Sequence, residues 1–125
     1  MSVTENKALA VDFYCTAFGG EPEKASSHHM GREYVQHSPQ YGDGSAAFET
    51  FILGMRSQYP DMSLEVKRVI AEGDLVVLHS HLTLTPEEPG LALADFFRME
   101  DGKVVEHWDV VQIVPDTSEN SNTMF

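Results

Sequence analysis

The stretch VVEHWDVVQ, residues 104–112, places two titratable side chains on a strand face that is otherwise apolar. Its β-branched residues and its lack of Gly and Pro predict a strand, in which side chains alternate between two faces. His107 and Asp109 then share a face with Val105 and Val111. Charged groups that face a core are costly unless they are paired or hydrated. We therefore expect a polar floor inside an apolar cavity, which suits an acid/base site.

The turns between the predicted strands bring further titratable groups to this face. The EDG turn is expected to place Met99 opposite Lys103, and Asp95 then lies opposite His107. If PEEPG closes the preceding hairpin, His79 lies beside Asp95. Five titratable groups are thus predicted to share one face: His79, His81, Asp95, His107 and Asp109. The apolar positions expected around them include Leu93, Phe97 and Val111.

Such a pocket could remove a proton next to a carbonyl group. That step needs a base and a hydrogen-bond donor for the enolate oxygen. Asp109 is the candidate base, because an apolar cavity raises the affinity of a carboxylate for protons. His107, His81 or a protonated Asp95 could polarise the carbonyl. The GxSxG motif of serine hydrolases is absent, and no nucleophile is needed.

A metal site is the main alternative at the same place. His79-x-His81 puts two imidazoles on one strand face, and His107 or Asp95 could complete a set of ligands for zinc or another divalent ion. Spacing of this kind is common by chance, and glycine-rich phosphate loops are absent. We therefore expect neither a metal nor another cofactor.

The elements that must position these residues follow from the hydrophobic period. Ser2 and Glu5 have the spacing of a capping box, and the helix that they begin should stop at Gly19-Gly20. Pro22 should open a second, short helix up to about Met30. A third helix is predicted between Ser45 and Pro60, with Phe48, Phe51, Ile52 and Met55 buried. Beyond Pro60 the period changes to two, which predicts antiparallel strands at 63–71, 75–85, 91–99 and 103–113.

An extended segment, Tyr34 to His37, precedes the third helix. Tyr34 and His37 should border the cavity mouth, although His37 could equally form a hydrogen bond that fixes its loop. Together with His79 and His81, the expected substrate-binding residues are His37, Tyr34, Phe48, Phe97 and Val111.

Composition sets the context of this site. The 125 residues fit a single domain, 1–125, with a polar tail at 115–125 that we expect to be irregular. A net charge of −12 argues against nucleic acid and anionic membrane as partners. The N-terminus lacks the pattern of a signal peptide, no apolar run is long enough for a membrane span, and the single Cys15 suits a reducing compartment. We expect a cytoplasmic protein.

The motifs YVQHSPQYGDG (34–44) and ADFFRMEDGKVVEHWDVVQ (94–112), after a helical first half, resemble the SnoaL-like polyketide cyclases of the nuclear transport factor 2-like superfamily. The chain also resembles the SnoaL-like aldol-condensation subgroup. This resemblance implies an α+β fold, a cone-shaped barrel in which a strongly bent antiparallel sheet wraps around a helix. It also implies a homodimer, and it assigns the acid/base role to Asp109. The cyclases carry a histidine where this chain has Asp95.

Two functions of different classes stay open. One is a cofactor-free acid/base enzyme, such as an aldol-type cyclase, an isomerase or a dehydratase, acting on a small hydrophobic carbonyl compound. The other is a non-catalytic module that binds a small apolar ligand.

The outward strand face, with Val104, Trp108 and Val110, is too apolar for a freely solvated sheet, which favours a homodimer.

Overall fold

The first two helices begin and end at the residues that the sequence marks for them. In the computed structural model, which describes residues 1–125, α1 spans Val3–Phe18 and α2 spans Pro22–His29. The Ser2 hydroxyl accepts a hydrogen bond from the Glu5 backbone N–H at 3.0 Å, and the Glu5 carboxylate accepts one from the Ser2 N–H. The predicted capping box is therefore present.

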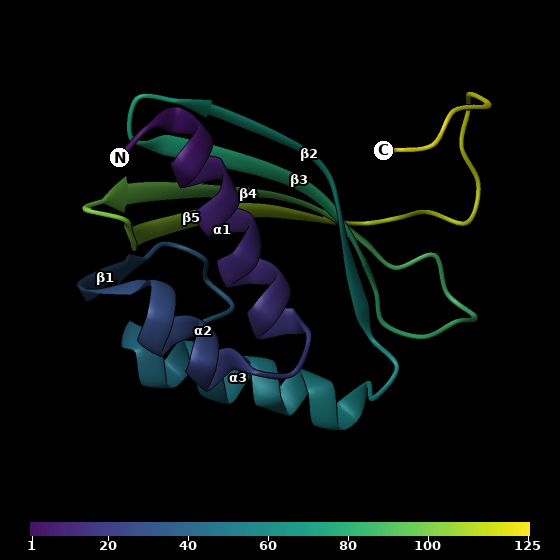
Figure 1. Ribbon diagram of the computed structural model, residues 1–125. Coiled ribbons are helices and arrows are strands. Elements are labelled where there is room, and N and C mark those ends of the chain that lie inside the picture. Colours follow the sequence, from purple (N-terminus) through teal and green to yellow (C-terminus); the bar gives the residue numbers. More distant parts are fainter.

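Five strands form one mixed sheet in the order β1-β5-β4-β3-β2 (Figure 1). They are β1 (Met30–Gln36), β2 (Ser63–Glu72), β3 (Leu75–Thr83), β4 (Leu91–Glu100) and β5 (Lys103–Ile113). The predicted antiparallel meander of β2 to β5 is confirmed. β1 was predicted only as an extended stretch, and it adds a parallel pairing with β5. The sheet is strongly curved, as expected, but it does not close into a barrel, because β1 and β2 remain its edges.

The helices cover one face of this sheet, which we call the inner face (Figure 1). α1 packs mainly against β2 and β3, while α3 (Gly44–Gln58) packs against β1 and α2. Phe13 joins these layers, since its ring stacks on Phe48 of α3 at 5.3 Å and meets the edge of Phe97 of β4 at 5.8 Å. None of the three helices is long and apolar enough to cross a lipid bilayer.

The third helix is where the sequence predicts it, but it is not the helix that crosses the sheet. Phe48 and Ile52 are fully buried in the core, whereas Phe51 and Met55 are only partly buried. α1 lies across the inner face instead (Figure 1). The apolar stripe of α3 identified a buried helix correctly, but a stripe does not say which partner buries it.

The β4–β5 hairpin differs from the predicted one in its turn and in a bulge. A two-residue turn at 101–102 has positive φ values of 51° and 75°, as in a type I′ turn. Glu100, rather than Met99, therefore faces Lys103. Further along, the register shifts because Val105 is an extra residue on β5 without an opposite partner.

The bulge changes which residues meet on the inner face. Asp95 lies opposite Asp109, not opposite His107 as predicted, and His107 lies opposite Phe97. Val104 is fully buried on the inner face, so its predicted outward position is wrong. His107 and Asp109 themselves remain on the predicted face, because the slip relative to β4 is of two residues.

The β3–β4 pairing slips by one residue, and this moves two predicted site residues. Leu78 lies opposite Asp95, and His79 lies opposite Ala94. Side chains alternate along a strand, so His79 and His81 point to the outer face, away from Asp95. The prediction that these histidines share a face with Asp95 is wrong.

The outer face carries an apolar row that crosses four strands. Ile70 pairs with Val77, Val77 with Phe96, and Phe96 with Trp108. Ile70 is 62% exposed and Phe96 is 37% exposed. The tail after β5 has no helix or strand, and its last residue, Phe125, stacks on His81 of β3 with a ring-centre distance of 4.3 Å.

Candidate active site

Asp95 lies at the centre of the site, on β4, with no exposed surface. Its Oδ1 accepts a hydrogen bond from the Tyr14 hydroxyl at 2.7 Å and lies 2.8 Å from His107 Nε2. Its Oδ2 is buried and has no hydrogen-bond partner. Burial raises the pKa of Asp95 above its ordinary value, although the hydrogen bonds to His107 and Tyr14 oppose this shift. Asp95 therefore holds a proton more readily than an exposed carboxyl group.

His107 connects Asp95 to β1. Its Nδ1 lies 2.7 Å from Gln36 Oε1, and its ring stacks on Phe97 with a centre distance of 5.0 Å. Gln36 is fixed in turn, because its Nε2 donates to the Tyr34 hydroxyl at 3.0 Å and its Oε1 accepts from the Ser38 backbone N–H at 3.1 Å. The parallel pairing of β1 with β5 places Gln36 opposite His107.

Asp109 completes a cluster of three titratable groups. One carboxylate oxygen of Asp109, one of Asp95 and a ring nitrogen of His107 all lie within 4.8 Å of one another. Unlike Asp95 and His107, Asp109 is only partly buried. It is also the one acid that lines a cavity of about 40 Å³, which is otherwise mostly apolar. The other residues lining this cavity are Tyr14, Phe18, Gln40, Tyr41, Phe51, Met55, Leu82, Leu91, Leu93 and Val111.

Three tyrosines surround these acids as neutral donors. Burial is the main cause that raises the pKa of Tyr14, Tyr34 and Tyr41, and the negative charge of Asp95 raises it further. Their hydroxyl groups therefore stay protonated at neutral pH. Sequence reasoning missed Tyr14 and Tyr41. Tyr14 could have been found, since it follows Ala10 by four residues on the buried stripe of α1 and is the only stripe position with a hydroxyl.

Three predicted substrate-binding histidines lie outside this site. His37 stacks on Trp108 with a ring-centre distance of 4.9 Å, and its Nε2 is 2.7 Å from Glu106 Oε2. His79 contacts the Arg68 guanidinium, and His81 donates to the Pro89 carbonyl at 2.6 Å. The other predicted residues lie inside. Phe97 stacks on His107 of the cluster, Tyr34 accepts a hydrogen bond from Gln36, Val111 lines the cavity, and Phe48 packs in the core behind it.

The geometry does not fit the metal set that the sequence suggested. His79 and His81 lie on the outer face, so they cannot share an ion with Asp95 or His107. The cluster of Asp95, His107 and Asp109 is compact enough for ligands of one ion. His107 Nε2 also lies at hydrogen-bond distance, 2.8 Å, from Asp95 Oδ1, so a proton shared between these two atoms accounts for their contact.

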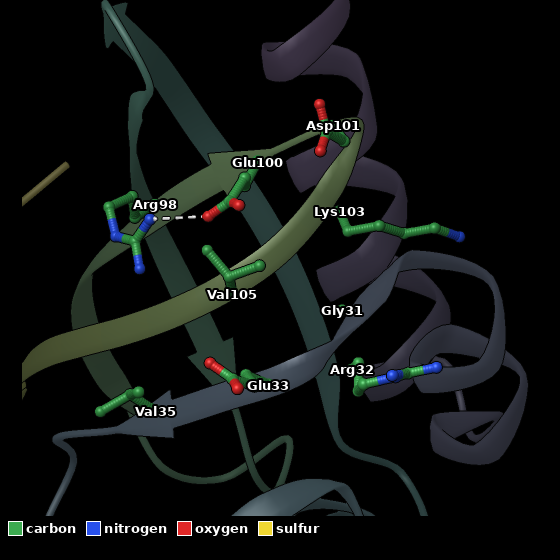
Figure 2. Close-up of a pocket in the computed structure, with 9 residues that line it drawn as sticks. All are labelled: Gly31, Arg32, Glu33, Val35, Arg98, Glu100, Asp101, Lys103 and Val105. Atoms are coloured by element: carbon green, nitrogen blue, oxygen red, sulfur yellow. Dashed lines mark hydrogen bonds and ion pairs between the residues drawn. The ribbon is translucent and has the colours of Figure 1, made fainter.

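A second recess, of about 330 Å³, lies on the outer side between β1 and the β4–β5 hairpin (Figure 2). It forms where the β1–β5 pairing is interrupted between Met30 and Val35, beside the bulge residue Val105. Two of its three cations are already paired: Arg98 binds Glu106 at 2.8 Å and Glu100 at 3.3 Å, and the Lys103 ammonium donates to the His28 carbonyl. The carboxyl groups that line this recess are all exposed, unlike Asp95 of the inner cluster.

The sequence family agrees with this fold. The model of the SnoaL-like domain matches residues 11–107. The chain belongs to the SnoaL-like domain family. No curated protein sequence matches it.

Several solved structures share the fold over most of their length. AclR from Streptomyces galilaeus, a candidate hydroxylase, is 30% identical, and the alignment covers 89% of this chain and 91% of AclR with a TM-score of 0.74. TsrD from Streptomyces laurentii is 23% identical, with coverages of 89% and 90% and a TM-score of 0.73. A candidate polyketide cyclase from Acidithiobacillus ferrooxidans is 19% identical, with coverages of 89% and 91% and a TM-score of 0.72. The last two likenesses concern the fold alone.

Proposed function

We propose that the protein is a cofactor-free acid/base enzyme that acts on a small hydrophobic carbonyl compound, as an aldol-type cyclase, an isomerase or a dehydratase. One observation carries the proposal: two carboxyl groups with different surroundings meet beside an apolar cavity. Asp95 is fully buried with a raised pKa, whereas Asp109 is partly exposed and lines the cavity. Such different environments separate the affinities of the two carboxyl groups for protons, which leaves the partly exposed Asp109 as the base.

In this mechanism Asp109 is the base. Its carboxylate takes a proton from the carbon next to the substrate carbonyl, the electrons of that C–H bond form the C=C bond of an enolate, and the negative charge moves to oxygen. A neutral phenol is the natural donor to that oxygen. Tyr41 lines the same cavity and keeps its proton, because burial raises its pKa well above the ordinary value.

The enolate can then react in two ways. In an aldol closure its carbon attacks a second carbonyl of the same substrate, and the proton on Asp109 neutralises the new alkoxide. In an isomerisation Asp109 returns the proton to a different carbon. Both routes restore the Asp109 carboxylate, and neither consumes another reagent.

The cavity must widen to admit a substrate. A volume of about 40 Å³ holds only about one to a few water molecules, whereas ligand sites usually measure about 300–1,000 Å³. Gln40 and Tyr41 belong to the loop between β1 and α3, and Met55 has a flexible, unbranched side chain. These parts of the lining are the ones that can move without breaking the sheet. A small cavity that can widen only at these parts favours a small or flat substrate.

Hydrogen exchange on carbon tests this function without the natural substrate. The protein is incubated in D₂O with small cyclic ketones, and deuterium uptake next to the carbonyl is followed by NMR. We expect wild-type protein and the outer-face control His81→Ala to catalyse uptake, and Asp109→Asn to lose it. Native mass spectrometry of the purified protein detects a retained ligand. A retained apolar ligand, together with no uptake above the buffer rate on any ketone, would instead identify a binding module.

A further inference from the structure

We propose that Gln36 is a positioning residue that keeps a hydrogen on His107 Nδ1 and thereby forces the Asp95–His107 pair to hold a second, transferable proton. The consequence for catalysis rests on the function proposed above, but the protonation state of His107 does not. Gln36 touches neither the cavity nor the base Asp109, so it would act through His107.

The orientation of the Gln36 amide is determined by two neighbours. The Ser38 backbone N–H can only donate, so the amide atom 3.1 Å from it is the oxygen Oε1. The amide nitrogen Nε2 then faces the Tyr34 hydroxyl at 3.0 Å and donates to it. A reversed amide would place two donors, the Ser38 N–H and the amide N–H, against each other.

This orientation fixes one hydrogen on His107. Nδ1 lies 2.7 Å from Gln36 Oε1, and Oε1 carries no hydrogen. Two bare acceptors at this distance repel, so Nδ1 must carry the hydrogen and donate it. A neutral imidazole with its hydrogen on Nδ1 presents a bare lone pair at Nε2.

The Nε2 atom faces Asp95 Oδ1 at 2.8 Å, and this contact also needs a hydrogen. The hydrogen lies either on Nε2, as imidazolium and carboxylate, or on Oδ1, as imidazole and carboxylic acid. The pair is neutral overall in both states, and moving the proton requires no other change. The Tyr14 hydroxyl donates to the same Oδ1 at 2.7 Å and holds the carboxyl group in place.

A neutral pair changes the surroundings of Asp109. Without the Gln36 acceptor, His107 could carry its single hydrogen on Nε2 and donate it to an Asp95 carboxylate. The pair would then bear a negative charge within 4.8 Å of the Asp109 carboxylate, inside a largely apolar site. Two negative charges this close repel each other strongly in a site of low dielectric constant, so ionisation of both groups is disfavoured. Gln36 therefore allows Asp109 to be the one net anion of the cluster.

NMR of the imidazole nitrogens tests the inference directly, since their ¹⁵N chemical shifts distinguish protonated from bare nitrogen. In the wild-type protein we expect a protonated Nδ1 on His107 at neutral pH. Gln36→Met removes the acceptor with little change of shape, and the hydrogen should move to Nε2. Gln36→Glu keeps an acceptor, so it should retain the hydrogen on Nδ1. Tyr34→Phe leaves Oε1 in place and should also retain it.

The outcomes separate this inference from the proposed function. A bare Nδ1 in the wild-type spectrum overturns the inference, whether or not Gln36→Met folds. Deuterium uptake should fall about 10- to 100-fold in Gln36→Met, as for loss of one orienting hydrogen bond. The inference stands and the proposed function fails if Nδ1 is protonated as expected while the wild-type protein catalyses no uptake. Equal uptake in an active wild type and in Gln36→Met overturns the positioning role.

Discussion

Removing the Tyr14 hydroxyl should destabilise the protein, and more so at high pH than at low pH. Tyr14→Phe keeps the ring, so its edge contacts with Phe18 at 4.8 Å and Phe97 at 5.2 Å survive. What is lost is the 2.7 Å hydrogen bond to Asp95 Oδ1, in a site where both residues are buried. The perturbation therefore isolates one buried hydrogen bond.

The size of the effect follows from the charge of the acceptor. A hydrogen bond to a neutral group contributes about 0.5–1.5 kcal/mol, and one to a charged group about 1.5–3 kcal/mol. Asp95 gains negative charge as the pH rises through its raised pKa, so the Tyr14 bond becomes more valuable. We expect a loss of about 1 kcal/mol at pH 4.5 and about 2–3 kcal/mol at pH 8.5. At about 4 °C per kcal/mol, the melting temperature at the higher pH should fall by about 8–12 °C.

Urea unfolding at the two pH values measures both losses of free energy. It is followed by circular dichroism and by the fluorescence of the single tryptophan, Trp108. Tyr59→Phe is the matched control, because the Tyr59 hydroxyl only meets the exposed Gln58 side chain at 3.3 Å. That variant should change the free energy of unfolding by less than about 0.5 kcal/mol. A Tyr14→Phe loss that equals the control, or that is the same at both pH values, would refute the hydrogen bond to an ionisable Asp95.

Three further predictions concern the acids and the outer face. Asp109→Asn should keep the fold by circular dichroism and slow deuterium uptake by about 10²–10⁴-fold, the usual contribution of a positioned base, so undiminished uptake removes Asp109 from the mechanism. The raised pKa of Asp95 means that the folded state binds its proton more tightly than the unfolded state. This proton makes its whole contribution to the free energy of unfolding below the pKa of Asp95 in the unfolded chain. The contribution is lost as the pH rises through the pKa of Asp95 in the folded state. Asp95→Asn should therefore flatten the fall in urea-derived stability that wild type shows as the pH rises above about 4, the unfolded pKa, and an unchanged slope would contradict it. We also propose that the apolar row on the outer face pairs with a second copy of the chain. Phe96→Glu should then give a monomer by sedimentation, whereas a wild-type monomer at micromolar concentration would rule out the dimer.

The helices and strands could be predicted because each leaves a local mark. Ser2 and Glu5 begin a helix through their own backbone contacts, and the change of period after Pro60 predicts β2 to β5 within a few residues. The inner-face position of His107 and Asp109 also followed from alternation within one strand. The partner of β1 could not be predicted in this way, because parallel pairing joins segments that are about 70 residues apart and leaves no local signal.

The registers across connections were harder to predict than the strands themselves. The segment between β3 and β4 is seven residues long, 84–90, so turn chemistry did not fix which residues face each other. A slip of one residue there moved His79 and His81 to the outer face.

Tyr14 was missed for a different reason. A helical stripe shows that a residue is buried, but the contact between its hydroxyl and Asp95, 81 positions later, depends on how α1 lies across the sheet.

The bulge at Val105 also decides how the chain can tolerate a change in length. Val104 and His107 both point inward although two residues, rather than one, lie between them. Val105 is therefore the extra residue that interrupts the regular alternation of faces. Deleting Val105 would leave a regular ladder with Met99 opposite Val104 and Arg98 opposite Glu106, and every site residue on β5 would keep its face. Deleting Trp108 instead would place His107 and Asp109 on opposite faces of the strand. β5 could therefore lose one residue at this point and still keep every side chain of the cluster on the inner face.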